Sequence, residues 1–106
     1  MSAVSKGCVK NANETKTFTF DQRVPISSYL LAMAVGEISG IDISPRCKIY
    51  SEPSLVKAAA YEFAQTEEFL QIAEDLTFEY QWGRYDVLCL PPSFSYGGCE
   101  NPCIVS

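Results

Sequence analysis

The pattern of apolar and polar residues gives the two halves of the chain different characters. In the first half, residues 16–20 alternate, with both phenylalanines on one face, as in a half-buried strand. Residues 28–35 are almost continuously apolar, residues 37–43 alternate again, and residues 47–50 form another short apolar run. These patterns predict a series of antiparallel strands with a bend or bulge at Gly36. The polar residues before them predict a loop or a strand end.

The second half begins with a helical pattern. Ser51 is a preferred N-cap residue, and the glutamate and proline that follow suit a first helical turn. Residues 55–76 contain neither glycine nor proline, and their apolar residues recur at helical spacing. The apolar stripe lapses at Gln65 and Thr66. This lapse predicts a kink, or a second helix with Thr66 as its N-cap.

A loop, a short strand and a second loop follow the helical segment. Residues 80–85 form the first loop, in which Gly83 suits a tight turn. Residues 86–90 predict a short strand that a proline pair ends. The predicted fold class is therefore mixed, with strands of an antiparallel β domain followed by the helix, strand and loop of an α+β domain. The change near residue 50 divides the chain into residues 1–50 and residues 51–106, and the second part alone has little to pack against.

Composition excludes several classes of partner. The 106 residues carry a net charge of -5, and the eight basic residues are scattered, which argues against nucleic acid and anionic membranes as partners. No apolar stretch is long enough to span a bilayer. The N-terminus lacks the apolar region of a secretory signal. We therefore expect a cytoplasmic protein whose five cysteines are free thiols.

The chain contains no histidine. Histidine is the commonest general base and metal ligand, so neither a Ser-His-Asp nor a Cys-His arrangement can be built from these residues. A catalytic zinc site usually takes at least one histidine ligand. We therefore expect no catalytic residue, no metal site and no bound cofactor in this chain.

The most distinctive short stretch is the loop Ser95-Tyr-Gly-Gly-Cys-Glu-Asn101. Glycine allows the backbone to approach a ligand closely, and a carboxylate beside such a loop can hold an ammonium group. Gly97, Gly98 and Glu100 are therefore a candidate amine-binding site. From spacing alone, an ordinary turn with a solvated glutamate is the commoner outcome.

Other groups of residues have a structural and a functional interpretation. The neighbouring aromatics could line an apolar pocket, but aromatics more often belong to a core. The acidic pairs of the helical segment are typical of a solvated face. The cysteines are expected to be small, buried apolar residues. The aromatics are Tyr80, Trp82, Tyr85, Phe94 and Tyr96; the acidic pairs are Glu67-Glu68 and Glu74-Asp75; the cysteines are Cys8, Cys47, Cys89, Cys99 and Cys103.

Residues 82–103, WGRYDVLCLPPSFSYGGCENPC, resemble the stretch of the M1 zinc aminopeptidases that leads to their G-G-M-E-N motif. Residues 24–36, 40–46 and 50–63 are similar to the same family. Residues 68–76 are similar to the branch that includes leukotriene A(4) hydrolase, with aminopeptidase B as a relative. The resemblance is colinear and covers about residues 16–103, which makes it specific.

The resemblance implies a fold and a set of roles. In that family an N-terminal β domain precedes a thermolysin-like catalytic domain, so residues 1–50 would end the former and residues 51–106 begin the latter. Glu100 would grip the free α-amine of a peptide. The motif glycines would hydrogen-bond its backbone, and Tyr96 would line the pocket for its first side chain. The partners of the whole enzyme would be peptide N-termini or a small lipid epoxide, with zinc as cofactor.

The chain departs from the family pattern at several places. Cys99 stands where the motif has methionine, and Ser27 and Ser95 replace family prolines. The family's H-E-x-x-H helix and its distal zinc-binding glutamate come after this stretch. We therefore expect a catalytically inactive fragment that carries the amine-binding loop, with Tyr96 to Glu100 as substrate-binding residues. The alternatives are a short paralogue that binds peptides or proteins without cutting them, and a cysteine-based thiol protein.

Overall fold

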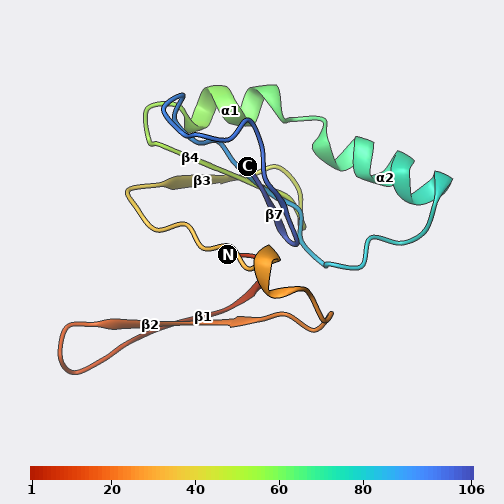
Figure 1. Ribbon diagram of the computed structural model, residues 1–106. Coiled ribbons are helices and arrows are strands. Elements are labelled where there is room, and N and C mark those ends of the chain that lie inside the picture. Colours follow the sequence, from red (N-terminus) through yellow and green to blue (C-terminus); the bar gives the residue numbers. More distant parts are fainter.

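The computed structural model describes residues 1–106 and contains two β-sheets and two α-helices (Figure 1). Strands β1 (Val4–Lys10) and β2 (Lys16–Asp21) form an antiparallel hairpin that stands apart from the other elements. The register shifts between Ser5 and Gly7, and Gly7 adopts a φ of 120° there, which suits glycine. The prediction for β2 is confirmed. The loop or strand end predicted before it is mostly a strand.

The second sheet has five strands in the order β3-β4-β5-β7-β6. The two inner pairs, β4–β5 and β5–β7, are parallel, whereas the outer pairs β3–β4 and β6–β7 are antiparallel. Strands β3 and β6 therefore form its two edges. The strand bounds are β3 Ser39–Asp42, β4 Lys48–Ser51, β5 Asp86–Leu88, β6 Glu100–Asn101 and β7 Ile104–Val105. The mixed fold class predicted from the sequence is confirmed.

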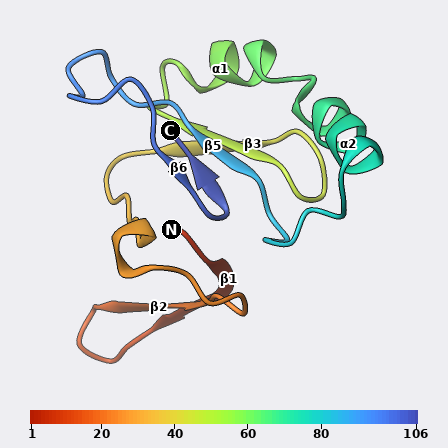
Figure 2. The same ribbon diagram turned by 45° about the vertical axis from the view of Figure 1, so that its right-hand side comes forward.

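Two helices follow β4, and the predicted break between them is confirmed. Helix α1 (Val56–Glu62) packs on β3 and β4, and helix α2 (Thr66–Leu76) extends beyond the sheet (Figures 1 and 2). The predicted caps are wrong. Ser51 belongs to β4, where its hydroxyl donates to the Cys89 carbonyl at 3.3 Å. Thr66 is already helical, and its hydroxyl donates to the Phe63 carbonyl at 2.7 Å instead of accepting from an N–H.

The strand predicted over residues 28–35 is also wrong. Only a single 3-10 turn, Ser28–Leu30, forms there, and the segment after it is irregular. The backbone of this segment is hydrogen-bonded to the N-terminal residues and not to a neighbouring strand: the Ser2 N–H donates to the Ala32 carbonyl at 2.9 Å. The apolar side chains after the turn remain exposed: Leu31 by 64%, Met33 by 74% and Val35 by 86%.

The core of the molecule is small. Nine residues are buried, mainly at the centre of the five-stranded sheet around Ile49, Val87 and Leu88. The chain exposes 7714 Å², compared with about 5,900 Å² for a compact monomer of 11.7 kDa. Its radius of gyration is 14.7 Å, compared with about 13 Å for a compact domain of this length. No helix of the structure has the length and apolar character needed to cross a membrane.

Candidate functional site

The glycine loop connects β5 to the short hairpin of β6 and β7, at one edge of the five-stranded sheet (Figure 2). This hairpin was not predicted. Its turn is Asn101-Pro102-Cys103-Ile104, with proline at the second position and Cys103 at a φ of 67° at the third, as in a type II turn. Pro102 and Cys103 are buried, so the turn packs firmly against the rest of the sheet.

The pairing of the hairpin turns the polar backbone groups of Glu100 outward. The Cys99 N–H donates to the Ser106 carbonyl at 2.8 Å, and the Ser106 N–H donates to the Cys99 carbonyl at 3.0 Å. In antiparallel strands such hydrogen-bonded pairs alternate with non-hydrogen-bonded ones. The next pair, Glu100 with Val105, therefore directs the N–H and C=O of Glu100 to the free side of β6. An extended peptide could pair with this edge.

Glu100 and Cys99 point to opposite faces of the strand. Cys99 and Asn101 line an apolar cavity of about 360 Å³, which Ala32, Leu88 and Phe94 also line. Glu100 does not line this cavity, is exposed, and forms no ion pair or side-chain hydrogen bond. The structure therefore brings the glycines and the glutamate together but places the Cys99 side chain away from the carboxylate.

The two glycines of the loop have different surroundings. A Cβ on Gly98 would lie 3.3 Å from the Ser106 carbonyl oxygen and 3.5 Å from the Glu100 Oε1, which is a close approach. A Cβ on Gly97 would have no atom within 4 Å. Neither glycine has a positive φ. Gly98 therefore allows the loop to pack closely against Ser106, and the space beside Gly97 is open.

The predicted aromatic group separates into two pairs. The rings of Phe94 and Tyr96 meet edge to face at 5.9 Å, and those of Tyr80 and Tyr85 at 5.8 Å. Tyr96 is 69% exposed beside the glycines. Tyr80 is half-buried: its hydroxyl donates to the Arg84 carbonyl at 3.0 Å, and burial raises its pKa. Tyr96 therefore remains near the loop, whereas the Tyr80–Tyr85 pair is structural.

Asn101 connects the loop to a distant part of the chain. Its side-chain amide donates to the Leu30 carbonyl, in the 3-10 turn, at 3.0 Å. This bond joins the edge strand to a segment 71 residues earlier. It fixes the residue next to Glu100, and nothing in the local sequence pattern indicates it.

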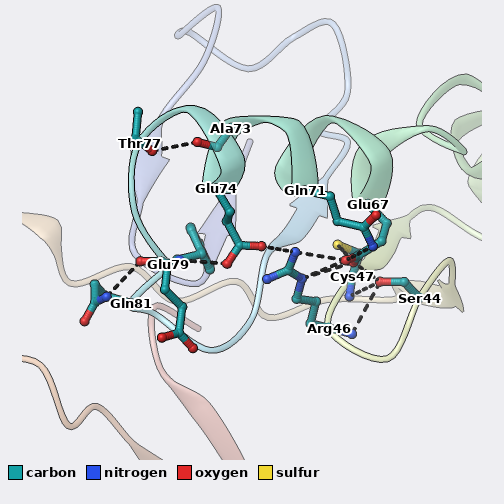
Figure 3. A network of polar contacts seen from close by, with 11 residues as sticks. Ser44, Arg46, Cys47, Glu67, Gln71, Ala73, Glu74, Thr77, Glu79 and Gln81 are labelled. Atoms are coloured by element: carbon teal, nitrogen blue, oxygen red, sulfur yellow. Dashed lines mark hydrogen bonds and ion pairs between the residues drawn. The ribbon is translucent and has the colours of Figure 1, made fainter.

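A second polar cluster, between α2 and the turn before β4, was missed. Arg46 donates to Glu67 at 2.9 and 3.1 Å and also to Glu74, while the Ser44 hydroxyl donates to Glu67 at 2.6 Å (Figure 3). Hydrogen bonds from Arg46 and Ser44 lower the pKa of Glu67 to about 2, and Arg46 together with the Tyr80 N–H lowers the pKa of Glu74. The fully solvated face predicted for these residues is therefore wrong. Their seven-residue spacing, which places both on one helix face, was the available signal.

The cysteines form no disulfide. Burial raises the pKa of the Cys47, Cys89 and Cys103 thiols, which makes them poor nucleophiles. No group of three or more cysteine, aspartate or glutamate side chains is placed to hold a metal ion. The loop around Glu100 is therefore the best candidate site.

Comparison with known proteins gives close relatives over nearly the whole chain. The leukotriene A-4 hydrolase of Xenopus laevis is 48% identical over 106 residues, which cover 98% of this chain. The leucine aminopeptidase 2 of Yarrowia lipolytica is 50% identical over 95 residues, or 89% of this chain. The chain belongs to the M1 peptidase family.

Solved structures of M1 relatives share the fold. Native yeast LTA4 hydrolase matches with a TM-score of 0.85 at 37% identity, and the yeast enzyme in complex with bestatin matches at 38% identity with a TM-score of 0.85. Both matches cover 98% of this chain but 16% of the solved chain. The chain likewise spans 17% of the Xenopus relative and 15% of the Yarrowia relative. No protein-family model matches the chain.

Proposed function

We propose that this chain supplies the part of an M1 aminopeptidase that holds the free amine of a peptide substrate. Glu100 binds the α-ammonium group. The backbone of Gly97, Gly98 and Glu100 pairs with the substrate, and Tyr96 borders the pocket for its first side chain. One observation carries this proposal: an exposed carboxylate without a partner lies on the free edge of a sheet, beside a glycine with open space around it.

The geometry suits exopeptidase binding. A peptide that lies along β6 as an added strand would satisfy the outward N–H and C=O of Glu100. Its amino terminus would then lie within reach of the carboxylate of the same residue. The Cys99 side chain lines the apolar cavity, and its N–H and C=O pair with Ser106. This residue therefore holds Glu100 at the edge of the sheet and does not itself pair with the substrate. A carboxylate at the end of the binding edge favours peptides whose free amino terminus lies at that point.

Catalysis belongs to the part of the enzyme that this chain does not span. Zinc, which the M1 resemblance implies for the whole enzyme, would supply a Lewis acid that polarises a carbonyl and lowers the pKa of a bound water. This chain has no histidine to bind it. The whole enzyme would act on peptide N-termini or on a small lipid epoxide, in the cytoplasm. The role of the chain is to position the substrate.

We also infer that two domains of the longer enzyme meet within this chain, and the change of sequence pattern near residue 50 is one candidate for their boundary. Strands β3 and β4 share the five-stranded sheet with β5. Strand pairing therefore favours a structural boundary before Ser39, in the irregular segment between the hairpin and the sheet.

The isolated chain should not hydrolyse peptides. It lacks the histidines of a zinc site, and its own side chains form no metal cluster. We expect no release of product from a leucyl reporter by the purified 106-residue chain. Cleavage that a chelator abolishes, and that follows the chain through purification, would contradict this proposal.

The role of the glycines is tested in an exchange chimera, defined as the Yarrowia leucine aminopeptidase 2 with its matching stretch replaced by that of this chain. A Gly97→Ala change adds a methyl group where no atom lies within 4 Å, so the isolated chain should melt as before. In the chimera the same methyl group would meet the substrate backbone. We expect KM for a leucyl peptide to rise about tenfold with little change in kcat.

An unchanged KM in the Gly97→Ala chimera would contradict the proposed backbone contact. The control is a Gly36→Ala change, because Gly36 also has open space and lies in the irregular segment. It should leave both the melting temperature and KM unaltered.

The free edge also supports a second candidate, a module that binds peptides without cutting them. This function needs only β6 and Glu100, both of which the chain contains. Saturable binding of a free-amine peptide by the isolated chain, lost on N-acetylation, would favour the module. Binding of both peptides with equal affinity would exclude it.

A further inference from the structure

Helix α2 is attached to the molecule by its polar face. Glu67, Gln71 and Glu74 point toward the turn that holds Arg46 (Figure 3). No residue of this 11-residue helix is buried. Amphipathic helices of globular proteins normally place their apolar stripe against the core and their charged residues outside. The arrangement of α2 is the reverse.

Three large apolar residues of α2 form a continuous exposed face, which we call the α2 face: Phe69, Ile72 and Leu76. Leu70, which is partly buried, lies on the attached side. The exposed fractions of Phe69, Ile72 and Leu76 are 63%, 49% and 79%. At about 100° of rotation per residue, these three positions lie roughly opposite Glu67 and Glu74. The contacts with Arg46 therefore hold the helix so that the α2 face points to solvent.

The amount of exposed surface indicates a large missing contact. The chain exposes 7714 Å², roughly 1,800 Å² more than a compact monomer of its mass. A standard protein interface buries only about 800 Å² on each partner. The excess is of the size that a permanent interface covers, and the α2 face is an apolar part of it.

Charge distinguishes between possible occupants of the α2 face. Glu68 and Asp75 border one side of it, α2 contains no basic residue, and the whole chain carries a charge of -5. A second copy of the chain would bring the same acidic residues against each other, which opposes association. The complementary surface is apolar and carries lysine or arginine at its rim.

We propose that the α2 face docks on an apolar, basic-rimmed surface of the M1 catalytic region that this chain does not span, supplied by the same polypeptide or by a separate one. The relatives support such an occupant, because they match almost the whole chain yet are several times longer. The proposal is independent of Glu100 and the glycine loop. It can fail while the amine-binding role stands.

Alkylation of an Ile72→Cys variant tests the docking surface. The thiol is labelled with an uncharged maleimide, in the dilute isolated chain and in the exchange chimera, and each rate is divided by the rate in denaturant. Peptide mass spectrometry separates this site from the native cysteines. We expect labelling to be at least about tenfold slower in the chimera, because the reagent must await local opening of the interface. Retained hydrolysis of a leucyl reporter shows that the chimera is folded.

Two results would overturn the proposal. One is equal labelling of Ile72→Cys in the isolated chain and the chimera. The other is protection in the isolated chain that increases with its concentration, since a second copy would then be the occupant. If the chimera does not fold, the same cysteine is placed at the aligned position of the otherwise unchanged Yarrowia enzyme. Protection or free labelling there decides the question in the same way.

Discussion

Replacing Glu100 with glutamine should lower kcat/KM of the exchange chimera for a leucyl reporter by roughly 10²- to 10³-fold. Glutamine keeps the shape of the side chain but removes its charge. A desolvated ammonium group would then lose its counter-ion, a loss on the order of 2–5 kcal/mol. Because the amine is bound in both the ground state and the transition state, the change should appear mainly in KM.

The control for Glu100→Gln is Glu14→Gln. Glu14 is an exposed carboxylate in the turn between β1 and β2, far along the chain from the loop. It should leave kcat/KM within about twofold, as surface substitutions away from a site usually do. The Glu100 variant should also discriminate less between free and N-acetylated substrates. A variant that keeps both KM and this discrimination would exclude Glu100 as the amine anchor.

Replacing Arg46 with leucine should detach α2 from the rest of the chain. The variant leaves Glu67 and Glu74 without their shared cation, and α2 has few other contacts with the sheets. We expect amide-exchange protection in α2 to fall at least about tenfold, while protection in β4 and β5 is retained. The control is Arg23→Leu, because Arg23 is 81% exposed and pairs only with Asp21. Unchanged protection of α2 would show that other contacts hold it.

The same cluster predicts a pH dependence. A carboxylate whose pKa is lower in the folded state stabilises the fold above its unfolded pKa, and this contribution is lost as the pH falls through the folded value. For Glu67 the window runs from about 4.5 down to about 2, and the shift of Glu74 has the same direction. Helical circular dichroism should therefore decrease across this window in the native chain. In the Arg46→Leu variant the decrease should be absent, because α2 is already detached at neutral pH.

Local patterns predicted the elements that pair within one sheet or follow one helical stripe. The alternation before Asp21 lies in β2, the lapse at Gln65 lies between α1 and α2, and the apolar run after Tyr85 lies in β5. The apolar run at residues 28–35 misled because hydrophobic residues indicate a buried segment only when a partner is present to bury them. Here Met33 and Val35 remain exposed. The sequence pattern of a segment does not show whether the surface that would bury it is present.

The candidate site was predictable in its residues but not in its geometry. The glycine pair and Glu100 stand out in the sequence, and the family resemblance supplies their roles. The edge position of β6 depends on a hairpin whose turn contains Pro102 and Cys103. Cys103 has a positive φ there, although cysteine has no preference for this conformation. The bond from Asn101 to Leu30 spans 71 residues. Such long-range contacts depend on the whole fold and leave no local pattern.

The reversed attachment of α2 has a consequence for the order in which a longer M1 chain folds. Ion pairs with Arg46 form without removing an apolar surface from water, so they can place α2 while its apolar residues still contact solvent. In a polypeptide made from its N-terminus, this segment leaves the ribosome before any sequence that follows it. With the docking we propose, the charged contacts would act as a template, and hydrophobic burial of the α2 face would complete the domain as a late step.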